Sequence, residues 1–382
     1  MNESLRAWWW VRQGLDGSLA KASAAEALER SGWCRSVGGA GPYLSIFART
    51  GASRESIDAD VKTVQLHELP SARGCTYVVP ASDFGIALRA GQGGDGEMAM
   101  ARKFLGVTDK EIEKLSRDVV DAVAKKPLDP RGLKDALGDK VRTLGAEGKK
   151  RGTTTTLPLA LGKLQNEGRI RRVPVNGRLD QQRYAYVAWK PPPKTDFSEE
   201  TLAVELARRF FRWAGPATQP QFSWWSGLGV KASKAAIEKL KLAQTEHGFL
   251  LPEDAPKLEK FRAPEKPQYA LVASLDNISH LRRAVAELLD GKDPKLESIS
   301  PLHDLPHHAI LDRGRLIGFW EYDFDAKKVA WATLEKAPSK LHDAIERTEA
   351  FVRDQLRDAR SFSLDTPESR GPRIEALRKL CR

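Results

Sequence analysis

The sequence predicts an α+β fold of tandem winged-helix domains followed by a small C-terminal domain that is β-barrel-like. Three observations support this prediction. Helical patterns are followed by a β-ribbon pattern three times along the chain. The turn signal Asn176-Gly177 joins the two segments of the clearest ribbon, and the last third of the chain carries short strand patterns instead.

The middle repeat shows the plan most clearly. Apolar residues recur at helical spacing from Ile112 to Val123, and Asp129-Pro130 supplies an N-cap and a first-turn proline for the next helix. Asn-Gly between two alternating segments is typical of a β-hairpin. The expected elements are helices over 109–125, 130–138 and 156–167, and a hairpin of 169–173 with 183–187.

The same order of helices and ribbon is expected once before and once after this repeat. The C-terminal strands lead into a helix over 342–356, and the basic end of the chain is expected to be flexible. The predicted division is an N-terminal winged-helix-like unit at 1–106, a second winged helix with a basic wing at 107–194, a third winged helix at 195–265, a β-rich domain at 266–360 and a basic tail at 361–382.

The composition is that of a globular protein that prefers polyanionic partners. Hydrophobic residues make up 41% and charged residues 30% of the 382 residues, an ordinary globular mix, and the formal net charge is +11. No apolar run approaches the ~20 residues that cross a bilayer. The N-terminus lacks a signal-peptide pattern, and the three cysteines are scattered. We expect a monomer in the cytoplasm, associated with the nucleoid and without membrane contact.

The histidines before the C-terminal strands look like a metal site only at first sight. His303, His307 and His308 fall around Pro301 and Pro306, which prevent a regular helix, so their spacing does not place ligands on one face. Neither a Walker loop nor a dinucleotide-binding glycine motif occurs. The sequence therefore predicts neither a metal nor a cofactor.

The charged residues of the repeats favour double-stranded DNA as the partner. A winged helix offers one helix to the major groove and a β-ribbon to the neighbouring backbone. Cations and hydroxyl groups precede the third helix of the middle unit, and arginines follow it, so both elements would meet phosphates. The alternatives are an ordinary capped loop and a solvated strand edge. The residues expected to contact DNA are Lys149, Lys150, Arg151, Thr153, Thr154, Arg169, Arg171, Arg172, Arg178, Lys231, Lys234 and Arg73.

Several stretches, in order along most of the chain, resemble the AlkZ/YcaQ family of DNA glycosylases. They are ELARRFFRWAGPATQPQFSWWSGLGVKA at 205–232, RGCTYVVPASDF at 73–84, LVASLDNISHLRR at 271–283, DRGRLIGFW at 312–320 and RQGL at 12–15. The resemblance implies tandem winged helices with a C-terminal β-barrel. It also implies monofunctional glycosylase activity on bulky or crosslinked N7-alkylpurines in duplex DNA.

The short polar motif of that family, Gln-x-Gln or Gln-x-Asp, is missing from its expected place. It should precede the helix that ends at Phe47-Ala48-Arg49, but residues 35–42 read RSVGGAGP. Cleavage of an N-glycosidic bond creates an oxocarbenium-like sugar, which needs a polar or anionic group to hold the attacking water. The sequence leaves open whether the glycines form a plain loop or allow a close approach of the backbone to DNA.

Two residues near this unit are candidates for the catalytic role. Glu68 could supply a carboxylate, although a structural ion pair with Arg73 is the alternative. Gln13 could supply an amide, although a surface position on its helix is the alternative. If neither acts, the chain is a catalytically silent DNA-binding protein, such as a damage sensor or regulator.

Overall fold

The N-terminal unit is a small sheet surrounded by helices. The computed structural model describes residues 3–92, 96–180, 183–289 and 302–380. In this unit the elements are α1 (Glu3–Arg12), α2 (Ala24–Ser31), β1 (Cys34–Arg35), α3 (Gly41–Thr50), α4 (Arg54–Lys62), β2 (Leu66–Pro70), the 3-10 turns η1 (Ala72–Gly74) and η2 (Ala81–Asp83), β3 (Thr76–Pro80) and α5 (Phe84–Gly91). Ser23 and Ser53 cap α2 and α4 through their side chains, so local capping chemistry sets both helix starts.

The sheet of this unit has the antiparallel order β1-β3-β2. Its register sets Cys34 and Glu68 against Val78, and Arg35 and Leu69 against Tyr77. Because neighbouring residues of a strand point to opposite faces, Glu68 shares a face with Cys34, whereas Arg35 shares the other face with Tyr77. The two faces meet different hydrophobic cores, one built around α3 and one built around α11 and α12.

The second unit contains the three predicted helices and the predicted hairpin, together with two further helices that were not predicted. Its elements are α6 (Gly96–Leu105), α7 (Asp109–Lys125), α8 (Pro130–Leu137), η3 (Gly138–Lys140), α9 (Gly145–Lys150), α10 (Leu157–Asn166), β4 (Ile170–Pro174) and β5 (Tyr184–Ala188). Asp129 caps α8 as predicted, its carboxylate accepting from the backbone N–H of Gly132 at 2.7 Å. The hairpin connection is longer than a two-residue Asn-Gly turn, because Leu179 is buried and its N–H donates to the Tyr43 hydroxyl of α3.

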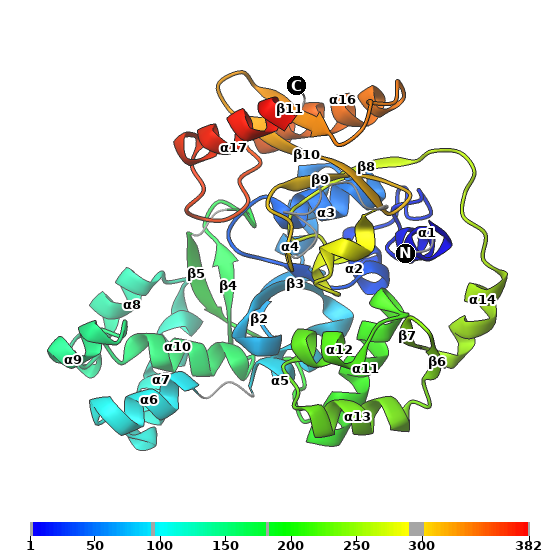
Figure 1. Cartoon of the computed structure of the whole chain (residues 1–382). Helices are drawn as coiled ribbons and strands as arrows, with labels where there is room; N and C mark the ends of the chain where they lie inside the picture. The colour runs from blue at the N-terminus through cyan, green and yellow to red at the C-terminus, as the bar shows by residue number, and fades with distance from the viewer. Residues whose placement is uncertain (1–2, 93–95, 181–182, 290–301, 381–382) are drawn as a thin grey trace.

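The third unit has the same order of elements. It contains α11 (Glu199–Ala214), α12 (Gln219–Ser226), α13 (Val230–Lys239), β6 (Ala243–Thr245), β7 (Gly248–Leu250), η4 (Pro252–Asp254) and α14 (Ala255–Lys260). Thr218 and Gln221 form a capping box at the start of α12. Figure 1 shows the second unit at the lower left and the third at the lower right of the N-terminal unit.

The C-terminal part is an open antiparallel sheet with helices. Its elements are β8 (Tyr269–Val272), α15 (Asn277–His280), η5 (Val285–Leu288), β9 (His308–Asp312), β10 (Arg315–Asp323), β11 (Lys328–Thr333), α16 (Leu341–Phe351), the π-helix η7 (Val352–Leu356) and α17 (Pro367–Leu380). The order is β11-β10-β9-β8, and within the described residues the sheet does not close into the predicted barrel.

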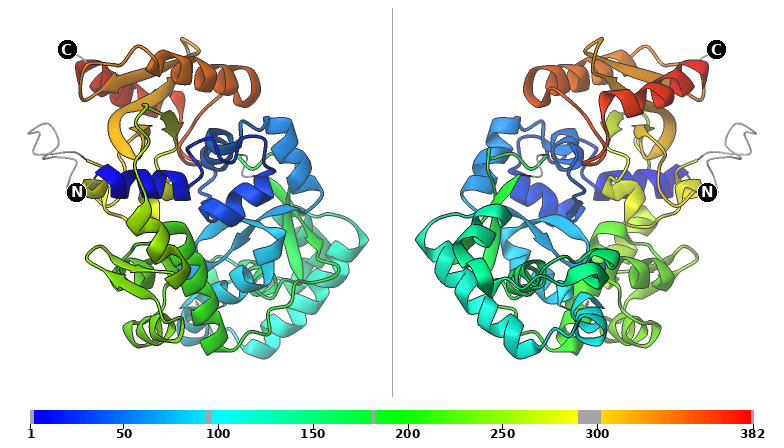
Figure 2. Two further views of the ribbon diagram at one scale, coloured as in Figure 1. Left: turned by 90° about the vertical axis from the view of Figure 1, so that its right-hand side faces the viewer. Right: turned by 90° about the vertical axis from the view of Figure 1, so that its left-hand side faces the viewer.

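The expectation of a flexible basic tail is wrong, because α17 packs on β10 and β11. Leu377 is fully buried in this contact, and Arg370 is buried beside Asp358 and Asp365. The apolar face of the helix and the buried ion pairs hold the segment in place. The side views in Figure 2 show the C-terminal layer above the N-terminal helices.

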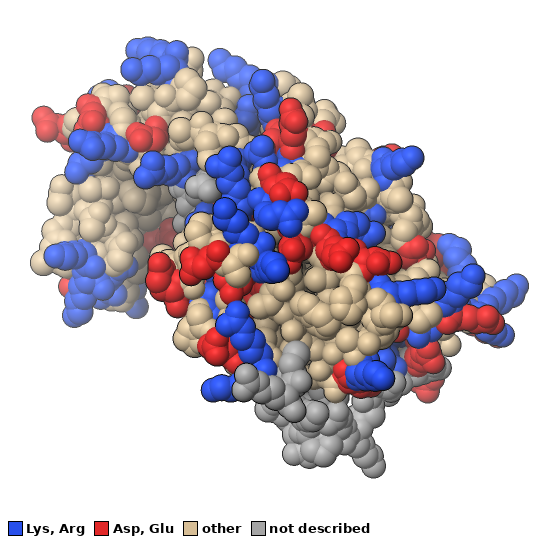
Figure 3. Space-filling model, turned by 90° about the horizontal axis from the view of Figure 1, so that it is seen from above, with Lys and Arg blue, Asp and Glu red and all other residues tan. Residues whose placement is uncertain are grey.

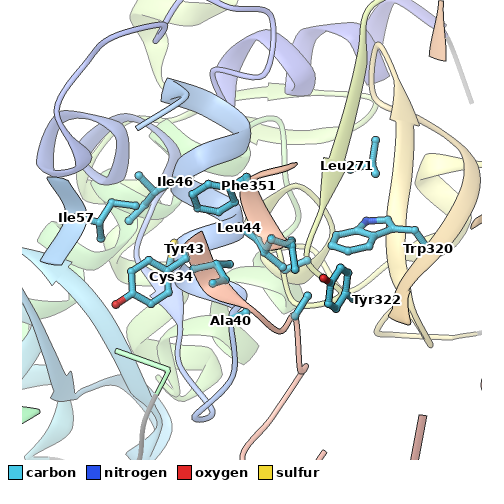
Figure 4. Close-up of a cluster of buried hydrophobic side chains, with 14 of the residues drawn as sticks. Cys34, Ala40, Tyr43, Leu44, Ile46, Ile57, Leu271, Trp320, Tyr322 and Phe351 are labelled. Carbon is cyan, nitrogen blue, oxygen red and sulfur yellow. The ribbon is translucent and has the colours of Figure 1, made fainter. Parts of the chain in front are cut away.

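A buried ion pair and a shared core join the N-terminal unit to the C-terminal layer. In Figure 4 the α3 side chains Tyr43, Leu44 and Ile46 lie with Trp320 and Tyr322 of β10 in one cluster. Arg49, at the end of α3, pairs in bidentate fashion with Asp276 before α15, at 2.8 Å for each contact. Both side chains are buried, so the relative position of the two parts depends on this pair.

In the part of the chain that the structure describes, no helix is both long and apolar enough to cross a membrane.

Candidate functional site

Glu68 sits on β2 in a partly closed, polar setting. The Ser36 hydroxyl, directly after β1, donates a hydrogen bond to the Glu68 carboxylate. Burial raises the pKa of Glu68, while the Ser36 hydrogen bond and the charges of Arg172 and Arg35 oppose that rise. A carboxyl with a raised pKa is a stronger base than an ordinary glutamate once it is ionised.

Ser36 lies within residues 35–42, where the resemblance places the missing polar motif. The structure therefore brings the candidate carboxylate, from another strand, into contact with this stretch. The alternative ion pair between Glu68 and Arg73 does not form. Instead, the Arg73 guanidinium lies over the Trp224 ring, 3.7 Å from its centroid.

A cavity of about 380 Å³ lies between α4 and β4, and Glu68 is not part of its wall. Arg171, Arg172, Lys62 and His67 contribute to its wall, and Arg172 and His67 also line the smaller space that Glu68 borders. Burial, and then the charges of Arg171 and Arg172, lower the pKa of His67 to about 3, so this imidazole is neutral at pH 7. The cavity is large enough for a single base, and the wall charges at that pH come mainly from arginine, lysine and carboxylate groups.

Gln13 occupies a structural position. The residue is fully buried, and its amide nitrogen donates to the Trp213 carbonyl oxygen at 2.8 Å. Arg49 donates to both the side-chain and the backbone oxygens of Gln13. Since both ends of the amide are engaged inside the core, Gln13 helps to fix Arg49 rather than facing an open space.

The glycine-rich turn at 38–41 is covered by the chain's own C-terminal segment. The Ala40 N–H donates to the Arg360 carbonyl oxygen at 2.8 Å, and the Ser363 N–H donates to the Val37 carbonyl oxygen at 3.0 Å. A side chain on Gly39 would collide with the carbonyl oxygens of Arg360 and Ser361. The close approach that Gly39 permits is thus to Arg360 and Ser361.

His308 forms a hydrogen bond to the C-terminal segment just before residues 360–363, which cover the glycine-rich turn. Its Nδ1 accepts from the Ser274 N–H, and its Nε2 donates to the Ala359 carbonyl oxygen at 2.9 Å. Burial lowers the pKa of His308, which is consistent with the neutral ring that these two hydrogen bonds require. Nearby histidines have other partners: His280 contacts Asp304, His307 contacts Glu321 and His303 contacts the Arg283 carbonyl oxygen. The described residues contain no metal-binding group of three or more such side chains.

Two substitutions in this turn give a first prediction. Gly39→Ala should destabilise the protein by about 2 kcal/mol, because its methyl group meets backbone that cannot move aside like a side chain. Gly41→Ala is the matched control, since its nearest neighbours would lie 3.9 Å away. Urea unfolding at 25 °C measures both, and equal midpoints for the two variants would contradict the close contact of residues 360–361.

The structure distributes the predicted DNA-contacting residues over several separate locations, with Arg73 apart from the others on η1. Lys149, Lys150 and Arg151 lie at the end of α9, at the far left of Figure 1, with Thr153 and Thr154 just beyond, whereas Lys231 and Lys234 lie on α13 at the lower right. Arg171 and Arg172 lie on β4, between α9 and α13 in Figure 1. In Figure 3, Lys and Arg side chains border the hollow beside the left-hand lobe, with Asp and Glu side chains among them.

Several of these cations already have partners. Arg178 pairs with Asp180, Arg151 with Glu147, Arg169 with Glu113 and Glu167, and Lys234 with Glu238. Arg172 donates to the Gln165 side chain at 2.6 Å and lies over the Tyr184 ring. For Arg171, the described residues provide no ion-pair partner, and burial lowers the pKa of its guanidinium.

Sequence reasoning missed Ser36 and Arg35 as parts of the site. A single serine carries no signal of its own, and only the register of β1, β3 and β2 shows that it faces Glu68. The two-residue length of β1 hides it from any periodicity analysis.

Comparison with known proteins agrees with this architecture. The model of the AlkZ-like DNA glycosylase family matches residues 37–372. Among solved structures, the chain is similar to the Streptomyces sahachiroi DNA glycosylase AlkZ, with a TM-score of 0.70 and 18% identity over 94% of this chain and 98% of that chain. At that identity the likeness establishes the fold. None of the curated proteins matches the chain. From the match over residues 37–372, this chain belongs to the AlkZ-like DNA glycosylase family.

Proposed function

We propose that this protein is a monofunctional DNA glycosylase that removes a bulky N7-alkylpurine or crosslinked base from duplex DNA, with Glu68 as the group that positions and activates water. The observation that supports this most is the hydrogen bond from Ser36 to Glu68. Burial raises the pKa of this carboxylate, and Ser36 belongs to the stretch, residues 35–42, where the family resemblance implies a polar motif.

The chemistry fits a single carboxylate. An alkylated purine is already a cationic leaving group, so its departure needs little acid catalysis, whereas the oxocarbenium-like sugar needs a nearby anion and a positioned water. A base inside a duplex must leave the stack before its glycosidic bond can be reached. The cavity beside Arg171 and Arg172 is the proposed receiving site for that base.

We further propose that α7, α8 and α10 with the β4–β5 hairpin act as a winged helix. In this interpretation the hairpin is the wing, and Arg171 and Arg172 hold the DNA backbone next to the cavity. The order of elements and the position of Arg172 between Gln165 and Tyr184 support it, since both contacts fix the guanidinium toward one side of the hairpin.

Release of free base by the purified full-length protein tests the proposed function. The substrates are duplexes that contain N7-methylguanine, a bulky N7-alkylguanine or a crosslink, each compared with the undamaged duplex. We expect abasic sites to form in at least one damaged duplex well above the rate in buffer. No acceleration in any of them would contradict the enzyme assignment.

A second candidate function is a DNA-binding protein without catalysis, acting as a damage sensor or regulator. The covered glycine turn favours it, because residues 360–363 occupy the space above the expected motif. A protein that shifts damaged duplex in a gel but leaves every lesion intact would support this function over the first.

The wing assignment predicts a specific salt dependence. Arg171→Ala with Arg172→Ala should weaken duplex binding for all sequences alike and flatten the log-log salt slope by about two units, because two phosphate contacts are lost. The matched control is Lys340→Ala with Arg347→Ala, two exposed cations at α16. Fluorescence anisotropy between ~50 and 300 mM KCl measures both, and an unchanged slope in the wing variant would show that these arginines do not touch phosphate.

A further inference from the structure

A line of alternating arginine and aromatic side chains crosses the junction of three units. Arg35 lies over the Tyr77 ring at 5.5 Å, and Arg73 and Arg283 lie over the Trp224 ring at 3.7 and 4.4 Å. Arg73 also acts on Tyr77, since its charge opposes the burial that raises the pKa of the tyrosine. We call these five residues the arginine–aromatic stack.

Each member of the stack comes from a different local segment. Arg35 and Tyr77 belong to β1 and β3, Arg73 to η1, Trp224 to α12, and Arg283 follows α15. Trp224 is half-buried, unlike its fully buried neighbour Trp225, which packs in the core. The Trp224 ring therefore lies at the surface of the junction, and the guanidinium groups of Arg73 and Arg283 lie over it.

Arg73 differs from the paired arginines of the second unit. Its side chain is exposed, and among the described residues no carboxylate lies within ion-pair distance of it. Arg73 and Arg283 both hold left-handed backbone conformations, with φ of 60° and 49°, which non-glycine residues seldom adopt. Such strain concentrates at ligand-binding positions. The Arg73 guanidinium is thus held in a fixed position without a carboxylate partner.

The other charges at the junction do not cancel this one. Asp304 accepts from Arg283 at 3.0 Å and also contacts His280, whose ring packs edge-on against Trp224. Arg35 donates to the Thr76 and Ser36 carbonyl oxygens. Asp304 pairs with Arg283, and the charge of Arg35 acts on Glu68, so the stack keeps a net positive charge at Arg73.

We propose that the arginine–aromatic stack binds the phosphodiester backbone of duplex DNA, with Arg73 as the residue that contacts phosphate. Stacking on Trp224 fixes the plane of the Arg73 guanidinium, so less side-chain freedom is lost when its fork engages a phosphate. This inference rests on DNA binding as part of the proposed function, but it does not require catalysis.

The test compares three variants of the full-length protein in duplex binding across a salt series. Arg73→Ala should reduce the log-log salt slope by about 0.9, the contribution of one phosphate contact on B-form DNA. Arg73→Lys should keep the wild-type slope, because an ammonium still neutralises a phosphate. Arg347→Ala, which removes an exposed cation from α16, should also keep it.

An Arg73→Ala variant with the wild-type slope would overturn the inference, provided that its circular dichroism and melting temperature match those of the wild type. If its melting temperature falls, Arg73→Gln repeats the measurement with a side chain that still packs on Trp224. A changed slope without base release by the wild type would support the stack and contradict the glycosylase. Base release by the wild type, together with an unchanged slope in Arg73→Ala, would support the glycosylase and contradict the stack.

Discussion

Glu68→Gln is expected to reduce base excision by about 10²–10⁴-fold, the usual contribution of a positioned acid or base. The amide can still accept the Ser36 hydrogen bond, so the local fold is retained while the negative charge near the sugar is lost. Single-turnover release of free base from the damaged duplex measures the effect. Glu346→Gln, an exposed position on α16, is the matched control and should excise at the wild-type rate.

The stability of this variant separates catalysis from folding. Because the pKa of Glu68 is raised in the folded protein, its contribution to stability is present below the unfolded pKa and is lost as the pH rises through the folded pKa. Where the buried carboxylate is ionised it therefore costs stability, and the neutral amide removes that cost. The melting temperature of Glu68→Gln should be no lower than that of the wild type.

The pH profile gives an independent readout. Wild-type excision should fall as the pH is lowered, with a midpoint above about 4.3, the value for an ordinary glutamate. Ser36→Ala should move this midpoint to higher pH, since the Ser36 hydrogen bond lowers the pKa of Glu68. Full excision activity in Glu68→Gln would rule out Glu68 as the base. So would a Ser36→Ala variant whose activity falls at the same acidic midpoint as that of the wild type.

Asp276→Ala is expected to destabilise the protein by about 3–5 kcal/mol, because it leaves the Arg49 guanidinium buried without its counterion. Asp276 also accepts from the Ser45 hydroxyl and caps α15 through the Ile278 N–H, so several groups lose a partner together. The free energy of urea unfolding at pH 7 measures the loss. Glu238→Ala, in an exposed ion pair with Lys234, should cost less than about 1 kcal/mol.

The pH dependence of this stability has a defined sign. Arg49 lowers the pKa of Asp276 despite its burial, so the pair contributes stability above the unfolded pKa and loses it as the pH falls through the folded value. The wild type should therefore lose stability on acidification, from about pH 4 downward. Asp276→Ala should show less of this loss, and an identical acid dependence in both proteins would contradict the assignment.

Local chemistry made much of the fold predictable. The cap at Asp129 and the helical spacing up to Val123 depend on residues close together in sequence, and the structure has these elements where they were expected. The family resemblance, which rested on ordered short stretches, is confirmed by the match over residues 37–372.

Contacts between distant segments could not be predicted in this way. The hydrogen bond from Ser36 to Glu68 depends on the register of three strands. The segment that packs over Gly39 lies more than 300 positions further along the chain. The basic composition of the last residues was visible in the sequence, but the packing of Leu377 on the C-terminal sheet was not. DNA contacts and the catalytic role of Glu68 remain predictions.

The contact between Gly39 and residues 360–361 also bears on how the protein is made. Domains generally fold during synthesis as their sequences leave the ribosome, the N-terminal ones first. Here the turn at 38–41 receives its final packing only after residues 359–363 have been translated, because the Ala40 N–H and the Val37 carbonyl bond to that segment. A ribosome-bound nascent chain halted before this point carries the candidate catalytic unit with its glycine turn still open.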